Sequence, residues 1–162
     1  MARGTRRQGR EMALKLLYSL ADHEGGSLDA VLEDFWKNFQ FRNDVLGEAV
    51  DDESLILSPE VRSFCELLVC GVTENLEKID QELKSYSTNW ALDRMARVDL
   101  AILRLAAFEL IYSPDVPHSV VINEAVELAK VFGGTDGHKY INSILDKLSL
   151  RLRASETRNK HV

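Results

Sequence analysis

The chain has 162 residues, of which 45% are hydrophobic and 28% are charged, and its formal net charge is −6 at pH 7. The length and apolar content predict one domain with a substantial core, while the acidic balance argues against a protein whose whole surface coats nucleic acid. No uncharged apolar run approaches about 18 residues and no signal-peptide core follows the N-terminal arginines, so we expect a cytoplasmic protein that makes no membrane contact.

Apolar residues recur at three- and four-residue steps, which predicts an all-α fold of six or seven helices. The first helix is expected from Thr5 to Ala21, before the helix-ending Gly25-Gly26 pair. The second is expected from Leu28 to Phe41, with Ser27 as its N-cap. The stretch 42–57 is acidic and has no clean period, so it is expected to form a loop.

The motif "SPEV" predicts a third helix, because Ser58 can cap it and Pro59 suits its first position. A bend is expected between Gly71 and Asn75, after which a similar apolar stripe continues. Cys65 and Cys70 lie in the apolar run "FCELLVCGV" and would point in different directions on a helix. We therefore expect small, reduced core residues rather than a disulfide or a zinc site.

The C-terminal part is expected to hold three helices. Residues 92–112 are apolar on nearly all sides, which is typical of a helix at the centre of a bundle. The next helix follows Pro117 and stops at Gly133, and Asp136 is expected to cap the last one. The tail, residues 156–162, is polar and expected to fray. The polar side of the middle helix is expected to comprise Asn123, Glu124, Glu127 and Lys130.

Charge is unevenly distributed along the chain. Residues 22–60 hold eleven acids against two bases, whereas residues 138–162 hold six bases against two acids. At the N-terminus, four arginines follow the i, i+3, i+4, i+7 spacing of one helix face, at the end where the helix dipole repels cations. A bound polyanion would offset this cost. Alternatively, the arginines form a solvated end that pairs with the acidic middle of the chain, and both interpretations stay open.

No arrangement of residues points to catalysis. The four histidines are scattered, and the chain has neither a GxxxxGK[ST] phosphate loop nor a GxSxG nucleophile elbow. The stretch "GGTDG" at 133–137 follows a predicted helix rather than a strand, so it fits a helix stop. We expect no enzyme, no cofactor and no metal site.

Three segments carry a family resemblance. "RRQGREMALKLLYSL" at 6–20, "VDLAILRLAAFELIYSPDVPHSVVINEAVELAKVFGG" at 98–134 and "HKYINSILDKL" at 138–148 resemble the NusB family of bacterial transcription antitermination factors. The resemblance spans nearly the whole chain and is weakest between residues 22 and 57. It implies one helical domain over residues 1–155, built from two roughly perpendicular three-helix sub-bundles at about 5–88 and 91–153.

The resemblance also implies a non-catalytic function. Such a protein binds the boxA element of ribosomal RNA leaders together with NusE, a small-subunit ribosomal protein, joins the RNA polymerase antitermination complex and assists rRNA maturation. The residues expected to bind RNA are Arg3, Arg6, Arg7, Arg10, Lys139, Tyr140 and Asn142. Gln8 stands where the family often has another base, so one phosphate contact is expected to be absent.

Several alternatives stay open from the sequence. Tyr140 suits stacking on an unpaired base, but it also fits the half-buried edge of a core. The chain could instead be a protein-interaction module or an accessory module for rRNA modification, without direct RNA binding, since the N-terminal domains of some rRNA cytosine methyltransferases resemble the same family. A homodimer is a further open alternative, and the C-terminal sub-bundle is the surface expected to meet NusE.

Overall fold

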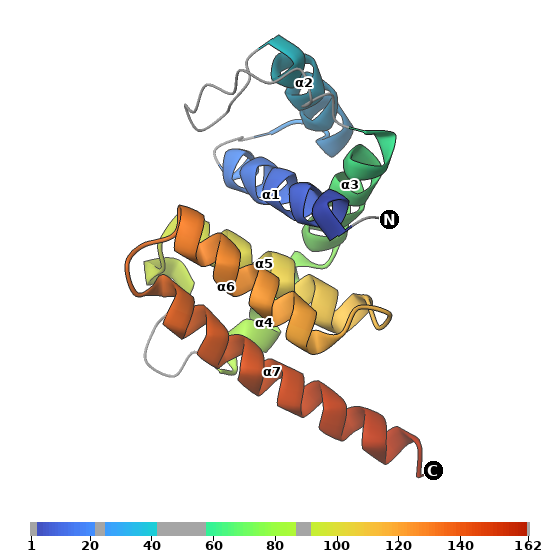
Figure 1. Ribbon diagram of the computed structural model, residues 1–162, viewed down its shortest axis with the longest axis vertical. Coiled ribbons are helices and arrows are strands. Elements are labelled where there is room, and N and C mark those ends of the chain that lie inside the picture. The colour runs from blue at the N-terminus through green and yellow to red at the C-terminus, as the bar shows by residue number, and fades with distance from the viewer. Residues whose placement is uncertain (1–2, 22–24, 42–57, 87–91, 162) are drawn as a thin grey trace. The chain divides into compact units, whose positions relative to one another are not determined.

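The computed structural model describes residues 3–21, 25–41, 58–86 and 92–161 (Figure 1). Within these ranges the chain forms seven α-helices and no strand, which confirms the expected all-α class. The chain divides into two compact units, residues 1–70 and 71–162, and each is described by itself below. No helix in the described ranges is long and apolar enough to cross a membrane. The loop expected over residues 42–57 lies outside these ranges.

Unit 1 contains α1 (Arg3–Leu20), α2 (Leu28–Phe41) and most of α3 (Pro59–Glu74). The two expected caps are confirmed. The hydroxyl oxygen of Ser27 accepts a hydrogen bond from the backbone N–H of Ala30 at 3.2 Å, and that of Ser58 accepts one from Val61 at 3.3 Å. Each bond satisfies an amide at a helix start that has no partner within its own helix.

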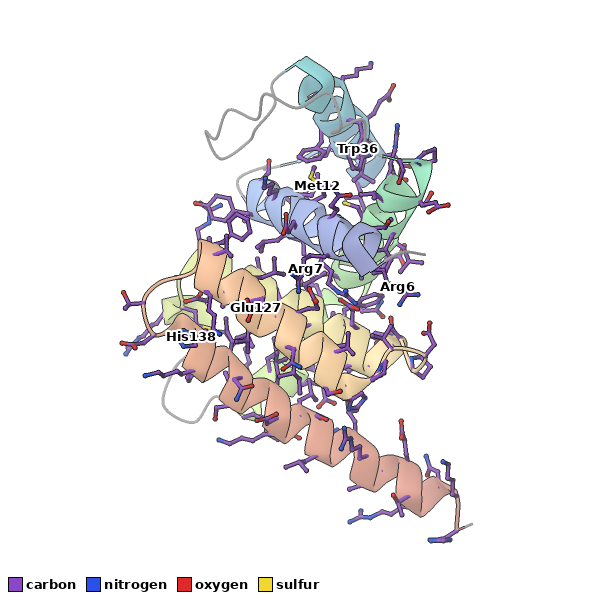
Figure 2. The ribbon with its side chains drawn as sticks, viewed as in Figure 1. Arg6, Arg7, Met12, Trp36, Glu127 and His138 are labelled. Carbon is purple, nitrogen blue, oxygen red and sulfur yellow. The ribbon has the colours of Figure 1, made fainter. Side chains whose placement is uncertain are left out.

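The core of unit 1 is formed by the apolar stripes of its helices, and Met12 and Trp36 are labelled on α1 and α2 in Figure 2. Neither cysteine forms a disulfide, and burial raises the pKa of the Cys65 thiol to about 12. The Cys65 thiol therefore stays protonated at neutral pH and behaves as a small apolar group. The buried apolar side chains of this unit are Met12, Ala13, Leu14, Leu16, Leu32, Trp36, Val61, Cys65, Leu68 and Val69.

Unit 2 is organised around one buried helix. Its elements are α4 (Leu76–Lys84), a 3₁₀ turn (Leu92–Arg94), α5 (Arg97–Tyr112), α6 (His118–Phe132) and α7 (Gly137–Asn159). The helix α5 packs against α4, α6 and α7, and every residue from Ala101 to Leu110 except Arg104 is buried. This confirms that the all-round apolar segment lies at the centre of a bundle.

The boundary between the units lies at Cys70 and Gly71, inside α3, rather than between residues 88 and 91. The reason is that α4 packs on α5 and α7. Asp80 of α4 accepts two hydrogen bonds from Arg104 of α5, each 2.9 Å long, in the two-pronged geometry that guanidinium and carboxylate favour. The helix is interrupted near the expected bend, because α3 ends at Glu74 and α4 begins at Leu76.

Three expectations about the C-terminal helices need correction. Asp136 occupies the N-cap position of α7 but makes no side-chain cap hydrogen bond. Glu124 was expected on the polar side of α6 and is instead buried, with an intramolecular partner. The tail expected to fray is helical to Asn159, and the hydroxyls of Ser155 and Thr157 donate to backbone carbonyls one turn earlier.

His118, the first residue of α6, links the stability of unit 2 to pH. Its Nδ1 atom lies 2.7 Å from the hydroxyl oxygen of Ser149 on α7. Burial lowers the pKa of His118 below its ordinary value of 6.5, the positive charge of Arg153 lowers it further, and Glu156 acts in the opposite direction. The folded protein therefore disfavours the protonated ring more than the unfolded chain does.

The free energy of unfolding is accordingly expected to be higher above pH 6.5 and to fall as the pH drops through that value towards the lower pKa of the folded state. The variant His118→Asn should lose this part of the decline, because asparagine does not titrate. Urea unfolding at a series of pH values between about 5 and 8 measures it. An equal decline in both proteins would contradict the assignment to His118.

Candidate nucleic-acid interface

The first candidate group lies in unit 1, on the N-terminal turns of α1, where Arg6 and Arg7 are labelled in Figure 2. The ring of Phe64, on α3, packs directly against Gly9 of α1. A Cβ atom placed on Gly9 would lie only 2.5 Å from Cδ1 of that ring. Since side chains larger than hydrogen cannot fit there without movement, Gly9 permits the close approach of the ring to α1.

Two of the four arginines use this ring as a platform. The guanidinium carbon of Arg6 lies 5.7 Å from the centroid of the Phe64 ring, and that of Arg10 lies 5.6 Å from it. Cation–π contacts of this kind contribute about 0.5–2 kcal/mol each, depending on how dry they are. Arg10 is 4% exposed and Arg6 is half-buried, so Phe64 limits the positions that both cations can take.

The remaining arginines are placed differently. Arg7 is exposed, although both it and Arg10 have intramolecular partners. Arg3 is the first residue of α1, and its side chain lies outside the described part of the structure. The first turn of α1 carries no acidic residue, so its backbone dipole is not offset by a carboxylate there. Both interpretations of the arginine cluster, a polyanion site and an internally paired helix end, therefore stay open.

The second candidate group lies in unit 2, at the start of α7. Lys139 is exposed, and its ammonium lies 3.9 Å from the carboxylate of Asp136. Asn142 is also exposed and donates a 3.4 Å hydrogen bond to Asp146. Both interactions are at the surface, so water and salt weaken them and a phosphate could replace either one.

Tyr140 is half-buried, and its hydroxyl oxygen is buried within the protein. Burial raises the pKa of this hydroxyl, which keeps it protonated at neutral pH. The exposed part of the residue therefore does not include the hydroxyl oxygen. A base could stack only on whatever part of the ring remains accessible, so the stacking function of Tyr140 stays a prediction.

The start of α7 lies close to the carboxylate of Asp99, in the first turn of α5. A Cβ atom on Gly137 would lie 2.8 Å from Oδ1 of Asp99, and one on Gly133 would lie 2.7 Å from the same oxygen. The two glycines thus let the α6–α7 connection pass directly over the N-terminus of α5. Burial raises the pKa of Asp99, as expected for a carboxylate in so closed a position.

The structure brings the predicted residues together as two groups, one in each unit. Arg6, Arg7 and Arg10 share α1, whereas Lys139, Tyr140 and Asn142 share the start of α7. Phe64 and Gly9 were missed as members of the first group. Phe64 appears in the sequence only as one apolar residue in the stripe of α3, and no pattern in the sequence links it to an arginine 54 positions earlier.

Comparison with known sequences gives a consistent result. A sequence model of the NusB family matches residues 7–150. The transcription antitermination protein NusB of Syntrophotalea carbinolica is 54% identical over 153 residues, covering 94% of this chain and 97% of that protein. The NusB of Geotalea uraniireducens is 47% identical over 152 residues, covering 94% of this chain and 99% of that protein.

Solved structures agree in fold. The structure of NusB from T. maritima superposes with a TM-score of 0.71 at 30% identity and covers 89% of each chain. A chain in the solved complex of the antitermination factors NusB and NusE with double-stranded RNA superposes with a TM-score of 0.70 at 19% identity, covering 93% of this chain and 99% of that one. The second likeness supports the helical fold alone.

Proposed function

The chain belongs to the NusB family of transcription antitermination proteins, and on that premise we propose that it binds boxA-type single-stranded RNA together with NusE. In this function the protein is not an enzyme and needs no cofactor. It joins the RNA polymerase antitermination complex, supports transcription of rRNA and assists maturation of the small-subunit rRNA. Arg3, Arg6, Arg7, Arg10, Lys139, Tyr140 and Asn142 are the proposed RNA-binding residues.

The observation that carries this proposal is the arginine cluster on α1. In a chain of net charge −6, Arg6 and Arg10 are held over the Phe64 ring and Arg7 is exposed beside them. Guanidinium groups match phosphate oxygens in a two-pronged geometry and also stack on bases. A cluster whose cations oppose the helix dipole gains most from a ligand that supplies negative charge.

The partner class follows from the family and from one solved complex. The complex of NusB and NusE with double-stranded RNA includes a chain of the same fold. We propose a single strand as the RNA of this protein, because sequence-specific RNA recognition relies on unstacked bases whose edges can be read. The duplex of the same sequence is then an informative competitor.

The test is RNA binding with and without purified NusE. Fluorescence anisotropy would be recorded for a boxA-type single strand, a scrambled single strand and the boxA duplex, at salt concentrations between about 50 and 200 mM. We expect the boxA single strand to bind best, more tightly when NusE is present and less tightly as salt rises. Equal binding of all three RNAs, or none with NusE present, would refute the proposal.

Tyr140 gives a more local test. If a base stacks on its ring, Tyr140→Ala should weaken binding of the boxA single strand by about 1–3 kcal/mol. Tyr140→Phe is the matched control, because it removes only the buried hydroxyl and should keep RNA affinity. Binding curves and thermal unfolding would be measured for both variants. A lower melting temperature for Tyr140→Ala with unchanged RNA affinity would instead make Tyr140 a core residue.

One observation favours a second candidate function. Arg10 is buried and has an intramolecular partner, as expected for a structural arginine rather than a ligand-binding one. If the other arginines are also structural, the chain would be a protein-interaction module, or an accessory module for rRNA modification, without RNA affinity of its own. The same binding experiment separates the two functions, since such a module binds none of the three RNAs.

A further inference from the structure

The last helix is longer than the bundle that it packs against. The buried positions of α7 are Ile141, Ile144, Leu145, Leu148 and Ser149. Beyond them, residues 150–160, named here the α7 extension, are exposed except for the half-buried Leu152. Figure 1 shows this end of α7 running past α4, α5 and α6. With a rise of about 1.5 Å per residue, it presents roughly 15 Å of helix to solvent.

The α7 extension is strongly basic, although the chain as a whole is acidic. It carries four cations, Arg151, Arg153, Arg158 and Lys160, against Glu156. At 100° per residue, Arg151 and Arg158 lie on one side of the helix, and Arg153 and Lys160 lie on nearly the opposite side. Cations therefore flank the line of the buried stripe on both sides.

These cations differ in their contacts. Arg151 is tied to α4 and the residues after it, because it donates hydrogen bonds to the carboxylate of Glu82 and to the hydroxyl of Tyr86. Arg151 thus fixes the base of the extension to unit 2. Arg153, Arg158 and Lys160 form no side-chain hydrogen bond or ion pair within the described ranges.

We propose that the α7 extension is a further RNA-binding surface, distinct from the candidate groups on α1 and at the start of α7. It contacts backbone phosphates of the nucleotides that flank the recognised element. This inference rests on the proposed RNA-binding function. A cationic helix with charges on two sides suits phosphate contacts, which position an RNA without reading its sequence. The net negative charge of the rest of the chain repels RNA, so the basic segments at the two ends of the chain are the favourable sites for phosphate binding.

The test compares wild type with the triple variant Arg153→Gln, Arg158→Gln and Lys160→Gln, in the presence of NusE. A second triple variant, Lys37→Gln, Lys84→Gln and Lys130→Gln, removes the same charge from exposed positions on other helices. The probes are a boxA-type single strand alone and the same strand with about ten uridines added on the 5′ or the 3′ side. Circular dichroism and thermal unfolding verify that each variant is folded.

We expect the extension variant to bind the bare element like wild type and to bind one of the flanked RNAs about tenfold less tightly. The slope of log affinity against log salt should also decrease by about two for that RNA, since three phosphate contacts on a single strand contribute about 0.7 each. The control variant should resemble wild type on every RNA.

Equal binding of wild type and the extension variant to all flanked RNAs would overturn this inference and leave the proposed function intact. Loss of NusE binding with unchanged RNA affinity would also overturn it, because the extension would then be a protein contact. If wild type binds neither the bare nor the flanked RNA, the proposed function itself fails, and the inference fails with it.

Discussion

Replacing Arg6, Arg7 and Arg10 together by alanine is expected to weaken binding of a boxA-type single strand by about 100-fold, or about 2.8 kcal/mol, in the presence of NusE. The reason is the loss of three cations clustered on the first turns of α1. The slope of log affinity against log salt should decrease by about two, because each phosphate contact with a single strand contributes about 0.7. Fluorescence anisotropy at several salt concentrations measures both quantities.

The three arginines are not equivalent, so single variants are part of this test. Arg10 is buried against Phe64, and its removal is expected to destabilise unit 1 as well. Arg7 is exposed, so Arg7→Ala should lower RNA affinity with little effect on thermal unfolding. A triple variant at Lys37, Lys84 and Lys130 provides the matched loss of charge. Unchanged RNA affinity in the folded arginine variants would contradict the proposed site.

Phe64 offers a check that leaves every charge in place. Phe64→Leu keeps an apolar side chain against Gly9 but removes the ring over which Arg6 and Arg10 lie. If the ring positions the cations, this variant should bind RNA more weakly while its salt dependence stays near that of wild type. An affinity equal to that of wild type would show that the ring has only a packing function.

The second large effect is expected at Gly71, where Gly71→Val should lower the free energy of unfolding by about 2–3 kcal/mol. A Cβ atom at this position would overlap the Phe108 ring, and both residues are buried in unit 2. The ring of a core phenylalanine on α5 has little room to retreat, so the added methyl groups overfill the site. Urea unfolding followed by circular dichroism measures the change.

Gly4→Val is the matched control, because Gly4 lies in a helix and an added Cβ would meet none of the described atoms within 4 Å beyond its neighbours and its own helix backbone. It should change stability little or raise it slightly, since valine disfavours a helix less than glycine does. Adding Phe108→Leu to Gly71→Val should recover part of the loss, which a double-mutant cycle reports as coupling between the two sites. Equal effects at Gly71 and Gly4 would show that the contact with Phe108 is unimportant.

Much of the fold could be predicted from the sequence because its causes are local. A three- and four-residue apolar period defines a helix face wherever it occurs, and α2 was predicted from Leu28 to Phe41, as observed. The caps at Ser27 and Ser58 depend on amides only three residues away, so the motif itself determines them. The candidate cations were found for the same reason, since their spacing on one helix is a local property.

Other features depend on which helices meet. α4 looks like a continuation of α3 along the chain, and only its packing on α5 and α7 assigns it to the C-terminal unit. Asp136 occupies the N-cap position of α7 but makes no side-chain cap hydrogen bond. Glu124 falls, by its spacing in the sequence, on the polar side of α6, but the packing of the helices buries it. For α4 and Glu124, helices distant in sequence determine the environment, whereas the carboxylate of Asp136 lies near the ammonium of Lys139, only three residues later.

The sequence by itself therefore determined the helices, the family resemblance and the uneven charge. Tertiary structure alone decided that Gly9 admits the Phe64 ring, that Gly71 admits Phe108, and that Arg10 is buried while Arg7 is exposed. The physical reason is that a helical period specifies which residues share a face, whereas the partner of that face is set by close packing between segments far apart in the chain.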